Sequence, residues 1–123
     1  MKWIVLALLL VFSLLVLSIA IAGEADVITV DVIKIGPNLY RFDVTVVHKD
    51  TGWDHYANKW DIVDPNGSVL GTRTLHHPHV NEQPFTRSLP LVEIPEDVKS
   101  VSVRAHDSQH SYGGQEVTID LPD

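Results

Sequence analysis

The sequence predicts an all-β domain built as a sandwich of seven antiparallel strands. Two observations predict it. Apolar residues recur at every second position, which is the period of a strand with one buried face. Turn residues (Gly, Pro, Asn and Asp) interrupt these runs about every 8–12 residues, as in immunoglobulin-like and fibronectin-III-like sandwiches. An up-and-down barrel is the main alternative, but such barrels usually have more than seven short strands.

Each expected strand is marked by alternation or by a turn. The second is the clearest, because every second residue from Tyr40 to His48 points to the same face. Asp64-Pro65-Asn66-Gly67 is a strong signal for the tight turn between the third and fourth strands. Trp60, Phe85 and Leu91 are expected in the core. In chain order, the expected strands cover residues 27–34, 39–49, 55–63, 68–75, 85–92, 98–106 and 115–121.

The first 22 residues form a separate unit in the sequence. A basic start at Lys2 precedes an apolar run over 3–22, which ends in the small residues Ala20-Ile21-Ala22. This pattern is typical of an export signal cleaved before Gly23, although the run is also long enough for a membrane anchor. We therefore expect a signal peptide or anchor over 1–22 and one domain over 23–123, in the periplasm or outside the cell.

Charge and cysteine content exclude several classes of function. The formal net charge is −7, and removal of Lys2 makes the domain more negative. A negative domain does not suit nucleic-acid backbones or anionic lipids, so membrane contact is expected only through residues 3–22, if they are retained. The chain has no cysteine, which excludes disulfides, thiolate nucleophiles and a lipidated cysteine.

All seven histidines follow Gly23, and the expected topology places them at one end of the sandwich. They lie in or beside the loops that follow the second, fourth and sixth expected strands. Imidazole nitrogen suits copper, zinc and iron, so a histidine cluster indicates a transition-metal site. Asp54, Glu82 and Asp107 are acids placed to bind the ion or to orient an imidazole. The candidate metal ligands are His48, His55, His77, His79, His106, His110 and Asp107.

Two resemblances bear on this cluster. The segments 51–60, 77–89 and 105–110 resemble a family of small, exported, uncharacterised proteins, which implies no activity. His55-Tyr56 through Trp60, and the segment 107–110, are similar to motifs of superoxide reductases of the desulfoferrodoxin type. Those enzymes are immunoglobulin-like and hold iron with four histidines and one cysteine. The resemblance implies His48, His55 and His110 as ligands, with Asp107 where the family has its cysteine.

Three functional hypotheses follow from the sequence. The first is an exported protein that captures or carries copper or zinc, through His77, His79, His106 and His110 with His55 nearby. The second is a mononuclear metal enzyme of the superoxide-reductase type, with iron as a further candidate metal. The third is a non-catalytic module that binds another exported or membrane protein. Whether the chain is an enzyme is left open, because no familiar catalytic motif is present.

Overall fold

A computed structural model describes residues 23–123, and this part of the chain contains seven β-strands and no α-helix. The signal peptide or anchor expected over 1–22 lies outside the described residues. Among residues 23–123, no helix has the length and apolar character needed to span a bilayer. The strands are β1 (Asp26–Gly36), β2 (Leu39–Val47), β3 (Ala57–Val63), β4 (Val69–Thr74), β5 (Phe85–Glu93), β6 (Ser100–Asp107) and β7 (Val117–Asp120).

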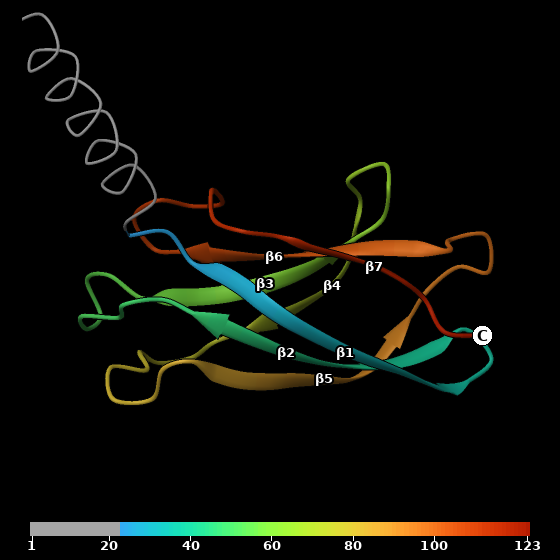
Figure 1. Cartoon of the computed structure of the whole chain (residues 1–123), viewed down its shortest axis with the longest axis horizontal. Coiled ribbons are helices and arrows are strands. Elements are labelled where there is room, and N and C mark those ends of the chain that lie inside the picture. Colours follow the sequence, from blue (N-terminus) through green and yellow to red (C-terminus); the bar gives the residue numbers. More distant parts are fainter. Residues whose placement is uncertain (1–22) are drawn as a thin grey trace, which may run out of the picture.

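The strands form two antiparallel sheets that pack face to face (Figure 1). One sheet has the order β1-β2-β5, and the other has the order β4-β3-β6-β7. The seven expected strands are therefore confirmed, and they form two separate sheets instead of one closed barrel.

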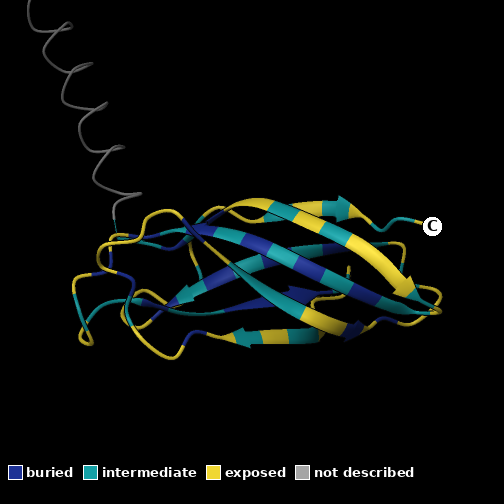
Figure 2. Ribbon diagram, turned by 90° about the horizontal axis from the view of Figure 1, so that it is seen from below, coloured by how far each residue is buried: buried dark blue, intermediate teal, exposed yellow. Residues whose placement is uncertain are grey.

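The core lies between the sheets and follows the alternation in the sequence. In β2 the side chains of Phe42, Val44 and Val46 are fully buried, and the residues between them are only partly covered (Figure 2). Trp60 of β3 is 0% exposed at the centre of the core, as expected. Leu91 is the exception: it is 64% exposed. A register shift in the β2–β5 pairing, between Tyr40 and Phe42, turns Leu91 outward and Val92 inward.

Three loops meet at one end of the sandwich, and together with the adjoining strand ends they carry every histidine of the chain. They connect β2 to β3, β4 to β5, and β6 to β7 (left side of Figure 1). Lys59 pairs with Thr74 in the β3–β4 register and with His106 in the β3–β6 register. The end of β4, the start of β3 and the end of β6 therefore lie at this end of the sandwich. The chain also enters β1 here.

Candidate metal site

Three histidines and one aspartate converge at this end of the sandwich. The Oδ2 atom of Asp107 lies 3.2 Å from His48 Nε2, 2.6 Å from His55 Nε2 and 2.9 Å from His110 Nδ1. His55 Nε2 and His110 Nδ1 are 3.2 Å apart. Ligand atoms of His48, His55 and Asp107 all lie within 4.8 Å of one another. We call His48, His55, His110 and Asp107 the four-residue cluster.

Two of these side chains, His48 and Asp107, point into the interior because of strand alternation. His48 continues the inward face of β2 one position beyond the last residue of that strand, and it is 3% exposed. Asp107 ends the inward face of β6, after Val103 and Ala105, and it is 0% exposed. Each polar residue thus occupies the place that the next core residue of its strand would take.

Two tight turns bring in the other two histidines. The β2–β3 loop folds back on itself through hydrogen bonds from Thr51 N to His55 O and from His55 N to Gly52 O. Gly52 has a φ of 147°, which glycine adopts readily. After β6, the backbone N–H of His110 donates to Asp107 Oδ1 at 2.6 Å. The same carboxylate therefore shapes the turn with Oδ1 and faces the cluster with Oδ2.

The ligand atoms around Asp107 Oδ2 are spaced nearly as they are around a metal ion. Tetrahedral zinc holds imidazole nitrogen and carboxylate oxygen at about 2.0–2.2 Å, which separates neighbouring ligand atoms by about 3.3 Å. The separations to Asp107 Oδ2, and between His55 and His110, are 2.6–3.2 Å in the structure. A small outward movement of the side chains would open the cluster to that geometry. The His110 side chain is 40% exposed, so the cluster is reached from solvent on that side.

Asp50 holds His48 in the orientation of a metal ligand. Its carboxylate side chain is 0% exposed, and Oδ1 lies 2.5 Å from His48 Nδ1. The Asp50 carboxylate accepts this hydrogen bond, so His48 Nδ1 carries the proton and is the donor, while Nε2 faces the cluster. Asp50 is itself fixed by the backbone N–H groups of Ala57 and His79, which donate at 3.0 Å and 2.7 Å.

Hydrogen bonding favours charge separation between Asp107 and His110. Burial opposes ionisation of Asp107, but hydrogen bonds from His110 and His55 outweigh it and hold the pKa of this carboxyl below its ordinary value. The hydrogen bond to Asp107 is also the main cause of the raised pKa of His110. An anionic oxygen is therefore kept at the centre of the cluster.

The other predicted ligands lie elsewhere. The rings of His77 and His79 are tilted against each other with centroids 4.8 Å apart, and His79 stacks on Phe85. His79 is 6% exposed and meets the cluster only indirectly, through Asp50. His106 is on the outer face of β6, where Nδ1 lies 2.7 Å from Asn58 Oδ1. Of the histidines in the first hypothesis, only His55 and His110 belong to the four-residue cluster.

Two residues that contact the cluster, Asp50 and Gly23, were not predicted from the sequence. Asp50 follows His48 by two residues, so the alternation of β2 extended into the loop could have indicated it. The carbonyl oxygen of Gly23 lies 3.0 Å from His48 Nε2 and 3.2 Å from His55 Nε2. No sequence signal relates Gly23 to these histidines. Asp54 and Glu82 are exposed, and Glu82 pairs with Arg87 at 2.8 Å.

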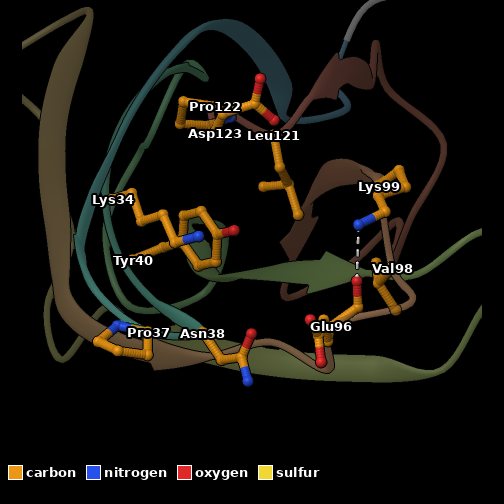
Figure 3. A pocket seen from close by; sticks show the side chains of 10 residues that line it. All are labelled: Lys34, Pro37, Asn38, Tyr40, Glu96, Val98, Lys99, Leu121, Pro122 and Asp123. Carbon is orange, nitrogen blue, oxygen red and sulfur yellow. Dashed lines mark hydrogen bonds between the residues drawn. The ribbon is translucent and has the colours of Figure 1, made fainter.

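A separate hollow lies at the opposite end of the sandwich (Figure 3). Lys34, Tyr40 and Lys99 contribute to its lining, and Lys99 Nζ donates to the carbonyl oxygen of Glu96 at 2.9 Å. Tyr40 and His48 are eight positions apart along β2 and its extension, which corresponds to about 27 Å. This hollow is therefore independent of the four-residue cluster.

Comparison with curated proteins finds a relative whose name states no activity. The chain is 42% identical over 97 residues to a protein of Halomicrobium mukohataei named "Putative lipoprotein". The match covers 79% of this chain and 47% of the relative, so the chain spans about half the length of the curated relative it matches. No protein-family model matches the chain.

Comparison with solved structures finds two similar chains. A hypothetical protein of Pyrococcus horikoshii OT3 has a TM-score of 0.53 at 12% identity, over 82% of this chain and 94% of its own. At that identity the likeness concerns the fold alone. The second, a superoxide reductase in the oxidised state, has a TM-score of 0.48 at 14% identity, over 81% of this chain and 90% of its own.

Proposed function

We propose that this chain is an exported protein that binds one transition-metal ion, copper or zinc, through His48, His55, His110 and Asp107. Binding for capture or transport is the favoured role. We also propose the boundaries 1–22 for the leader or anchor and 23–123 for the domain. The strand orders β1-β2-β5 and β4-β3-β6-β7 support an immunoglobulin-like classification of this domain.

The observation that carries the metal proposal is a pair of buried carboxylates on either side of one imidazole. The side chains of Asp50 and Asp107 are both 0% exposed, and His48 lies between them. Among the ion pairs of residues 23–123, neither carboxylate has a lysine or arginine partner. Buried charges in proteins are paired or coordinate a metal. A bound cation would neutralise these carboxylates in place of the His110 proton that faces Asp107.

The donor set narrows the class of metal. The cluster offers imidazole nitrogen and a carboxylate oxygen, with no thiolate in the chain. Such a set suits zinc, copper(II) and iron, and it is unlike the all-oxygen sites of magnesium and calcium. His48 Nε2 faces two oxygens, Asp107 Oδ2 and the Gly23 carbonyl, which is a position that requires a proton or a metal ion.

Export is supported by the leader pattern in residues 1–22 and by the name of the Halomicrobium mukohataei relative. The 123 residues contain no cysteine to carry a lipid. We therefore assign any retained membrane attachment of this chain to the apolar run 3–22.

Titration of the exported protein with Zn(II) and Cu(II) tests the proposal. We expect stoichiometric binding by the unaltered protein. In His55→Ala and His110→Ala the affinity should fall by more than the roughly 10–100-fold that is lost with a residue hydrogen-bonded to a ligand, because each variant lacks a ligand itself. His77→Ala and His106→Ala are matched controls, and both should bind as the unaltered protein does. Weak binding, or equal losses in all four variants, would contradict the proposal and favour a module that binds another protein.

A second candidate function is a mononuclear redox centre. The exposed side of His110 favours it, because a small molecule could reach a metal ion held in the cluster. Asp107 would then supply oxygen where superoxide reductases supply sulfur. Removal of superoxide by the iron-loaded protein, measured beside the His110→Ala variant, would support this function. A rate equal to that of free iron would exclude it.

A further inference from the structure

The backbone of Gly23 is built into the four-residue cluster. Its carbonyl oxygen lies 3.0 Å from His48 Nε2 and 3.2 Å from His55 Nε2. A Cβ at this position would lie 2.9 Å from His110 Cε1, and the φ of Gly23 is 102°. The backbone can approach the imidazole ring this closely only because Gly23 has no side chain.

Gly23 is also the residue that follows the expected cleavage site. Ala20-Ile21-Ala22 carries the small residues that suit signal-peptide removal after Ala22. Hydrolysis adds water across the Ala22–Gly23 peptide bond, leaving a carboxyl group on Ala22 and a free α-amino group on Gly23. The cleavage enzyme of the exporting cell performs this step.

Cleavage changes the chemistry of the Gly23 nitrogen. In the peptide bond its lone pair is delocalised into the carbonyl group of Ala22, so it is a poor metal ligand. In the free amine the lone pair is available, and nitrogen donors of this kind suit the same metals as imidazole. The amine nitrogen and the carbonyl oxygen of Gly23 are linked only through Cα and the carbonyl carbon, so one ion can bind both.

We propose that removal of residues 1–22 completes the metal site, with the α-amino nitrogen and carbonyl oxygen of Gly23 as a chelating pair beside His48, His55 and His110. This inference rests on the proposed metal-binding function. It makes processing a control on loading: the precursor binds the ion weakly, and the mature chain binds it tightly after export. The site is then complete only in the compartment where the leader is removed.

The test uses protein exported from the full-length gene, with its N-terminus determined by intact mass. We expect the mature chain to begin at Gly23, and bound Zn(II) to protect its α-amine from acylation, while Lys34 at the far end reacts equally with and without metal. A variant with one additional alanine between Ala22 and Gly23, cleaved before that alanine, moves the amine away from the cluster. It should bind Zn(II) at least about tenfold more weakly.

The outcomes separate this inference from the proposed function. Tight Zn(II) binding that needs His55 and His110, but leaves the Gly23 amine reactive and is unchanged in the extended variant, overturns the inference alone. An N-terminus other than Gly23 in the metal-binding protein also overturns it. No stoichiometric binding by any of the proteins overturns both.

Discussion

Replacing Asp50 with asparagine tests how the buried network prepares His48 for metal binding. The two side chains have the same shape, but an amide has one accepting oxygen and one donating nitrogen. Asp50 Oδ1 accepts from His48 Nδ1 and Ala57 N, and Oδ2 accepts from His79 N. In either orientation of asparagine, the amide nitrogen faces at least one of these donors.

Each orientation has a cost that the structure specifies. With its oxygen at the Oδ1 position, asparagine leaves the His79 N–H unpaired, at about 1–3 kcal/mol of folding stability. With the amide nitrogen at the Oδ1 position, the asparagine donates to His48 Nδ1. The His48 proton then moves to Nε2, which removes the lone pair that would bind the metal. Loss of the charged acceptor predicts metal affinity lower by roughly 10–100-fold, or about 1.4–2.7 kcal/mol.

Calorimetric titration with Zn(II), together with urea denaturation, measures both effects of Asp50→Asn. Asp54→Asn is the matched control, because it removes the same charge from the same loop at an exposed position. We expect the control to keep the affinity and stability of the unaltered protein. A folded Asp50→Asn protein with unchanged affinity would refute the assigned role of Asp50.

Three further changes test other parts of the structure. Burial lowers the pKa of His79, so this side chain stays neutral in the folded state at pH values where the unfolded chain protonates it. The free energy of unfolding should therefore fall as the pH drops below about 6.5, and it should fall less in His79→Phe. Urea denaturation at several pH values measures both. Equal pH dependence would contradict this reasoning. A Cβ on Gly114 would lie 2.0 Å from the Ala25 carbonyl oxygen, so Gly114→Ala should lower Tm by at least about 4–8 °C in a thermal melt, and Gly36→Ala by much less. Asp61 is 2% exposed and accepts hydrogen bonds from two hydroxyl groups, so Asp61→Asn should cost about 1–3 kcal/mol in chemical denaturation; no change would show that these bonds contribute nothing net.

The alternation of the strands could be predicted from the sequence because each strand buries one face. That pattern located all seven strands and placed Trp60 in the core. It failed at Leu91, where a register shift against β2 reverses the faces of β5. Such irregularities depend on the partner strand and leave no trace in the period of one strand.

The candidate site was only partly predictable for a related reason. Loop position alone places every histidine at one end of the sandwich, but it does not distinguish the two faces of a strand. On β6 this distinction separates Asp107, which points inward, from His106, which points outward. The resemblance to superoxide reductases implied His48, His55 and His110, which the structure brings together. Gly23 joins them only through the tertiary fold.

Crystals of the exported protein grown with Zn(II), and separately with Cu(II), would locate the ion through anomalous scattering at the absorption edge of each metal. We expect one strong peak at about 2.0–2.2 Å from His48 Nε2, His55 Nε2, His110 Nδ1 and an oxygen of Asp107. A peak at His77 and His79 instead, or no peak near Asp107 at saturating metal, would contradict the proposed site.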